Sequence, residues 1–178
     1  MMKLAEHFHL SEFTASETAA RWGIENTPQP LQLERLRCLA RGMEHVRQVL
    51  GVAVRITSGL RVLELNTVIG GAMTRQALEI VYRETANDYV RQITMLRIRS
   101  GKFGESISQH VDGSAADCTA PAFGPPATVC RAIEASDVRF DQLIYEIDWM
   151  HISFVEDRKP RRQVLTLKGG NYVVGIVD

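Results

Sequence analysis

The 178-residue sequence has little cysteine, no net charge and no long hydrophobic run. Its three cysteines, Cys38, Cys118 and Cys130, are odd in number, and their spacings match no zinc motif. We therefore expect reduced, buried thiols in a protein made in a cytosol. Lysine and arginine number 21, as do aspartate and glutamate, so the basic excess typical of nucleic-acid-binding proteins is missing. We expect no nucleic-acid partner.

Long apolar stretches are also missing. No run approaches the roughly 20 residues that a membrane-spanning helix needs, so we expect no membrane insertion. The opening stretch, MMKLAEHFHLSEF, is interrupted by Glu6, His7 and His9 and lacks the apolar core of a secretory signal. These absences predict a protein that is synthesised in the cytoplasm without a signal peptide.

Helix signals dominate the first half of the chain. Apolar residues recur at helical spacing from Leu31 to Leu50, and Gly51 ends the pattern. A second periodic segment, from Thr74 to Arg99, predicts another long helix with one apolar face. Between them, residues 52–57 alternate as expected for a strand with one buried face.

Strand signals dominate the second half. The stretches FDQLIYEI and WMHISFV are separated only by a tight turn near Asp148, and RRQVLTLKGGNYVVGIV has the Gly169–Gly170 turn of a hairpin. No repeat, low-complexity tract or linker divides the chain, so we expect one domain over residues 1–178. This order predicts an α+β fold in which N-terminal helices pack against a small antiparallel sheet.

The stretch SISQHVDGSAAD, from Ser106 to Asp117, is unusually polar for the middle of a domain. It contains His110 and Asp117, and His151 follows in an apolar strand. Two imidazoles and one carboxylate suit a three-ligand zinc site whose fourth position takes water. Gly113 would allow the chain to bend between the first two ligands. The same residues also suit a solvated loop and a histidine bonded to a backbone carbonyl.

Several motifs resemble one known family. SQHVDGSAAD and WMHIS resemble the Ser-x-His, Gly-x-Ala-x-Asp and Trp-x-His-x-Ser signature of the zinc D-alanyl-D-alanine carboxypeptidases. That family includes phage L-alanyl-D-glutamate endopeptidases and shares its fold with the hedgehog signalling domain. LSEFTASETAARWGIENTP, VRITSGLRVLELNTVIGG and FDQLIYE resemble further segments of its phage members. The resemblance covers nearly the whole chain except the middle helix.

The resemblance implies a role for each matching residue. His110, Asp117 and His151 would be the ligands of a Zn²⁺ cofactor. Arg61 would lie in the cleft and either polarise the substrate carbonyl or bind the substrate carboxylate. Ser108 would line the site beside His110, although it could equally cap a turn.

The general base is open between two carboxylates of YEIDWMH. Zinc-assisted hydrolysis needs a carboxylate near the attacking water, to take its proton and pass it to the leaving amine. Asp148 stands three residues before His151, as in several family members, and is preferred. Glu146 at the end of the preceding strand is the alternative.

The chain departs from the family beside this site. In the family members that it most resembles, the Gly-Gly turn is followed closely by Ser-x-His, whereas 38 residues separate Gly71 from His110 here. We interpret residues 73–105 as a helical insertion with an arginine-rich outer face. It could simply pack on the domain, form a lid over the cleft, or bind a partner or a second copy through helix 74–99.

The resemblance implies a peptidase that cuts the peptidoglycan stem peptide, for cell-wall lysis or remodelling by a phage or prophage. The protein would act on the wall in the periplasm after release from the cytoplasm, or be carried by the virion. Whether it acts as a carboxypeptidase or an endopeptidase is open. The alternative is a non-catalytic peptidoglycan-binding or phage tail module that retains the fold and the metal site.

Overall fold

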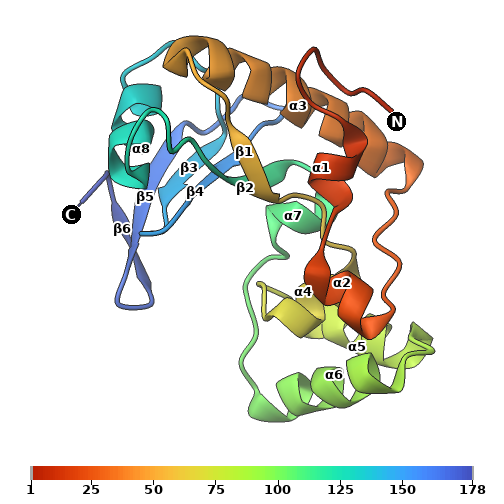
Figure 1. Ribbon diagram of the computed structural model, residues 1–178. Helices are drawn as coiled ribbons and strands as arrows, with labels where there is room; N and C mark the ends of the chain where they lie inside the picture. Colours follow the sequence, from red (N-terminus) through yellow and green to blue (C-terminus); the bar gives the residue numbers. More distant parts are fainter. Residues whose placement is uncertain (1, 178) are drawn as a thin grey trace.

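A computed structural model describes residues 2–177, which contain eight helices and one six-stranded sheet (Figure 1). The helices are α1 (Leu10–Thr14), α2 (Glu17–Trp22), α3 (Pro30–Leu50), α4 (Leu63–Ile69), α5 (Arg75–Glu84), α6 (Asp88–Ser100), α7 (Gln109–Asp112) and α8 (Pro126–Glu134). The strands are β1 (Arg55–Ser58), β2 (Ala115–Thr119), β3 (Gln142–Tyr145), β4 (Met150–Ser153), β5 (Gln163–Lys168) and β6 (Asn171–Val174). The predicted combination of helices and a sheet is confirmed.

The sheet is mixed, so the prediction of a purely antiparallel sheet is wrong. Its order is β1-β2-β4-β3-β5-β6, and all neighbours are antiparallel except β3 and β5, which run parallel. The cause lies in the connection after β4. That strand ends beside the start of β3, and the loop 154–162 carries the chain past β3, so that Gln163 pairs with Gln142. β5 therefore begins at the same edge as β3 and runs in the same direction.

One face of the sheet carries the main hydrophobic core. α3 and α8 cover this face, and Figure 1 shows α3 lying across the top of the sheet. As predicted, apolar positions of α3 recur at helical spacing and are buried from Leu36 to Leu50, although Leu31 is exposed, and Gly51 ends the helix in a left-handed conformation. Because side chains alternate along a strand, Ala116, Met150 and Ile152 face this core and their neighbours face the opposite side.

A second, smaller hydrophobic cluster joins α2, α4, α5 and α6. These four helices, here called the helical region, lie together below the sheet in Figure 1. The remaining helices and the sheet are called the sheet region. Residues 101–108 lead from α6 back to α7 beside the sheet. That residues 73–105 are an insertion stays a prediction.

The periodic segment 74–99 is two helices, so the prediction of one long helix is wrong. Thr85 is extended, and the Asn87 side chain accepts hydrogen bonds from the backbone N–H groups of Tyr89 and Val90 to begin α6. The break also divides the expected apolar face. Leu78 is fully buried, whereas Leu96 is exposed.

The three cysteines are free and buried, as predicted. Burial raises the pKa of Cys38 to about 11 and that of Cys130 to about 12, so both are protonated and unreactive at neutral pH. None of the helices within residues 2–177 has both the length and the apolar character needed to cross a membrane.

Candidate metal centre

Three elements of the sheet region bring two histidines and an aspartate together. Asp117 of β2 and His151 of β4 are directly paired across an antiparallel ladder, so their side chains project from the same face of the sheet. His110 reaches them from α7, the single helical turn that precedes β2. His110, Asp117 and His151 are only 2%, 6% and 7% exposed, respectively. Buried polar side chains at this spacing need hydrogen-bond partners or a bound ion.

The three side chains converge on one point. Nε2 of His110 lies 3.1 Å from Oδ1 of Asp117 and 3.2 Å from Nδ1 of His151, which is 3.0 Å from the same Oδ1. A tetrahedral zinc ion with bonds of about 2.0–2.1 Å has ligand atoms about 3.3–3.4 Å apart. The observed separations are close to this geometry. His110, Asp117 and His151 could therefore hold a metal ion.

Hydrogen bonding sets the protonation of this group. Nδ1 of His110 lies 2.7 Å from the carbonyl oxygen of Gly59, which can only accept a hydrogen bond. Nδ1 therefore carries the proton, and Nε2 presents its lone pair to the centre. Burial lowers the pKa of His110 and keeps it neutral. Burial opposes ionisation of Asp117, but the two imidazoles outweigh this effect and hold its pKa below the usual range.

The turn after β1 positions Asp117 through Arg61. Nε of Arg61 donates to Oγ of Ser58 at 2.9 Å, and Nη2 of Arg61 pairs with Oδ2 of Asp117. Gly59 passes close to Phe13. A Cβ added to Gly59 would lie 2.5 Å from the carbonyl oxygen of Phe13, so a larger residue would displace this turn. Arg61 thus occupies one carboxylate oxygen of Asp117 and leaves Oδ1 for a metal.

A cavity of about 630 Å³ opens beside the three residues. One wall consists of the end of α4 and residues 106–108, and the other is the sheet face that carries Ile144, Leu165 and Tyr172. Arg61 and Ser108 both line it. Ser108 also caps α7 by accepting a hydrogen bond from the backbone N–H of His110 at 3.4 Å. It therefore both lines the cavity and caps a turn, the two roles that the sequence suggested. Contact of Arg61 with substrate stays a prediction.

The structure brings Glu146, and not Asp148, to this cavity. Glu146 follows β3 on the face shared with Ile144, which pairs with His151. Burial, and then the charge of Asp117, raise the pKa of Glu146. Asp148 is exposed and does not line the cavity. Its N–H bonds the carbonyl of Glu146 at 2.7 Å across Ile147, whose positive φ of 65° reverses the chain there.

Sequence reasoning missed Tyr172, which comes to the cavity from β6. Burial, and then the charges of Glu146 and Asp117, raise the pKa of its hydroxyl. The hydroxyl is therefore close enough to both carboxylates to feel their charge. Only the parallel pairing of β3 with β5 carries the hairpin to this side, and no local pattern announces that pairing. Arg158 and Arg161 also line the cavity and were not expected there.

The family model described as Peptidase M15 matches residues 6–95. No curated protein and no solved structure gives a significant match to the chain. The matched part includes Arg61 and ends within α6, before the first of the three converging side chains. The metal-binding geometry is therefore an observation separate from the match. Because the matched residues make up just over half of the chain, the protein belongs to the peptidase M15 family.

Proposed function

We propose that this protein is a zinc-dependent peptidase that hydrolyses peptide bonds in the stem peptide of peptidoglycan. The observation that carries the proposal is the placement of His110, Asp117, His151 and a carboxylate, Glu146, in one cavity. Two nitrogens and one oxygen are a donor set that suits zinc and leaves a position open. Membership of a peptidase family supports the reaction, and the resemblance of the site motifs supports the substrate.

The residues around the centre divide the work. Zinc, when bound, supplies Lewis acidity that polarises a carbonyl and makes water acidic near neutral pH. Glu146 accepts the proton of the attacking water and delivers it to the leaving amine, a role that its raised pKa favours. Arg61 orients Asp117 through its contact with Oδ2. The hydroxyl of Tyr172 is a donor for the oxygen that becomes negative in the transition state.

The proposal does not choose between two peptide bonds of the stem peptide. The signature motifs are shared by D-alanyl-D-alanine carboxypeptidases and L-alanyl-D-glutamate endopeptidases, and the cavity residues suit either bond. Action on the cell wall by a phage or prophage protein stays a prediction. Mass spectrometry of the released fragments identifies the bond.

Bound zinc and fragment release from purified peptidoglycan test the proposal together. We expect one zinc per chain and cleavage for the wild type, and neither for His110→Ala. His45→Ala is the matched control, because His45 is a partly exposed histidine of α3 that pairs with Asp137 and does not line the cavity of the centre. Stoichiometric zinc without cleavage would instead indicate a binding module. Absence of zinc from the wild type would refute the metal site.

A further inference from the structure

A fully buried carboxylate gathers two arginines at one end of the cavity. Asp141, immediately before β3, accepts from Nη1 and Nη2 of Arg158 at 2.6 and 2.8 Å. It also accepts from Nη2 and Nε of Arg161 at 2.6 and 3.0 Å, and from the backbone N–H of that residue at 2.9 Å. Two guanidinium groups are thus fixed in place by one carboxylate, which leaves one positive charge of the three groups unbalanced.

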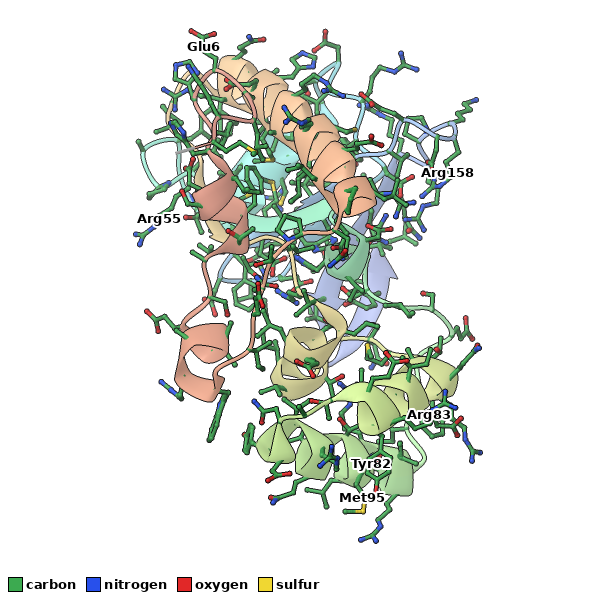
Figure 2. All side chains as sticks on the ribbon, turned by 90° about the vertical axis from the view of Figure 1, so that its right-hand side faces the viewer. Glu6, Arg55, Tyr82, Arg83, Met95 and Arg158 are labelled. Carbon is green, nitrogen blue, oxygen red and sulfur yellow. The ribbon has the colours of Figure 1, made fainter. Side chains whose placement is uncertain are left out.

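The two arginines face the cavity that holds the metal centre. Both line it, and their side chains are 44% and 45% exposed, although Asp141 beneath them is inaccessible. Figure 2 shows Arg158 beside the sheet, well away from Tyr82 and Arg83 of the helical region. The contacts with Asp141 use Nε and Nη2 of Arg161, and Nη1 is not among them. Donors therefore remain for a ligand in the cavity.

Neighbouring carboxylates balance the charge of the two arginines but leave hydrogen-bond donors of Arg161 available. Asp112 and Asp157 also lie near Arg158 and share Arg35, so three carboxylates stand beside three guanidinium groups. Gln109 donates its amide N–H to Asp141 at 3.1 Å, and its buried Oε1 has no hydrogen-bond partner among residues 2–177. A buried acceptor without a partner is costly. An acceptor beside two fixed cations suits a peptide ligand, which offers both an N–H group and a carboxylate.

We propose that Arg158 and Arg161 form a carboxylate-binding subsite, which selects stem peptides with a free carboxylate near the bond that is cut. This inference rests on the proposed function. Guanidinium groups bind carboxylates through paired, charge-assisted hydrogen bonds. Because Asp141 already holds both side chains, binding immobilises little additional structure.

The register of the sheet sets the position of that carboxylate. Asp141 stands three residues before Ile144, which pairs with His151. At about 3.4 Å per residue, the subsite lies about 10 Å from the metal centre along β3. An extended peptide advances about 3.3–3.6 Å per residue. The selected carboxylate therefore lies about three residues from the scissile bond.

Matched synthetic stem peptides test the subsite. In one series the α-carboxylate of D-glutamate is free or amidated, and in a second the carboxylate of the diamino acid is free or amidated. Binding is measured by calorimetry on the zinc-loaded Glu146→Gln protein, which should bind without cutting, and KM is measured on the wild type. A charge-assisted hydrogen bond contributes about 1.5–3 kcal/mol, so we expect one amidation to weaken binding about 10- to 100-fold.

The same measurement on variants assigns the effect to these residues. Arg161→Gln should remove most of the discrimination between the free and amidated peptides, and Arg161→Lys should keep part of it. Lys159→Gln is the matched control, since Lys159 is an exposed cation of the same loop that does not line this cavity. The melting temperature of each variant shows whether it is folded.

The outcomes separate this inference from the proposed function. Equal binding of the free and amidated peptides of both series to the Glu146→Gln protein, or no binding of any peptide, would overturn the subsite. Asp141 would then only attach the loop 154–162 to the sheet. If the free carboxylate is preferred in binding but no peptide is cut, the subsite stands and the proposed activity fails.

Discussion

The sheet region and the helical region both bury apolar side chains, but they differ in the polar groups that they bury. In the helical region the fully buried polar residues are neutral: Asn66, Thr67 and Thr94. The sheet region buries two histidines and two aspartates, namely His110, Asp117, Asp141 and His151. Burying charge is costly unless each group is paired. The sheet region therefore holds ionisable side chains at fixed positions, whereas the helical region forms a cavity wall and a separate apolar core.

The largest effect is expected at Glu146. Glu146→Gln removes the carboxylate that we propose as the proton acceptor, so we expect turnover to fall by about 10²–10⁴-fold while zinc stays bound. Asp148→Asn is the matched control, because Asp148 lies on the exposed side of the same turn, and it should retain most of the activity. Rates of stem-peptide cleavage measure both. The reverse pattern would restore Asp148 as the base.

Asp141→Asn should cause the largest loss of stability. Breaking a buried ion pair typically costs about 3–5 kcal/mol, and here one carboxylate serves two arginines. Hydrogen bonds from these arginines outweigh burial and lower the pKa of Asp141 below its usual value. Its stabilising contribution is therefore complete above a pH of about 4 and is lost as pH falls through the lowered pKa.

Urea unfolding of the wild type and Asp141→Asn between pH 7 and pH 2 measures this linkage. The difference in unfolding free energy should be greatest at neutral pH and should shrink in acid. A difference that is independent of pH would show that the charge of Asp141 does not stabilise the fold.

A smaller loss of stability is expected from Arg97 in the helical region. This arginine of α6 donates to the carbonyl oxygens of Thr67 at 3.0 Å and Gly71 at 2.8 Å, where α4 ends. Hydrogen bonds from a charged group contribute about 1.5–3 kcal/mol, so Arg97→Met should lower the unfolding free energy by that amount. Arg99→Met, on the exposed side of the same helix, should change it little. Equal effects of both would mean that Arg97 does not fasten the two helices.

The smallest effect is expected at the break between α5 and α6. Asn87→Ala removes the cap of α6 and should cost about 1 kcal/mol in thermal or urea unfolding. Asn87→Asp keeps the capping oxygen but loses the hydrogen bond from Nδ2 to the carbonyl of Trp22 at 2.7 Å. The two variants therefore separate capping from attachment to α2. A more stable Asn87→Ala protein would indicate that one continuous helix is preferred.

Patterns that repeat within a segment could be predicted from the sequence. The apolar positions of α3 recur over several turns, and β3 and β4 alternate on both sides of a tight turn. The convergence of His110, Asp117 and His151 followed from motifs in a recognisable order. In each case the signal lies in neighbouring residues or in a motif that carries its own spacing.

Three features could not be predicted, and only the last of them depends on pairing between distant segments. The apolar spacing continues across residues 85–87, so it conceals the capping Asn87. Counting back from His151 favoured Asp148, but the alternation of side chains along β3 puts Glu146 on the cavity face. Tyr172 reaches the cavity because β5 runs parallel to β3. The loop 154–162 sets this direction, because it returns the chain to the start of β3.

The most direct test of the central claim is anomalous diffraction at the zinc absorption edge from crystals of the zinc-loaded protein. We expect one strong peak bounded by Nε2 of His110, Oδ1 of Asp117 and Nδ1 of His151, the atoms that already converge. The peak should be lost in His110→Ala. Zinc bound elsewhere, or no zinc in protein that still cuts its substrate, would contradict the account.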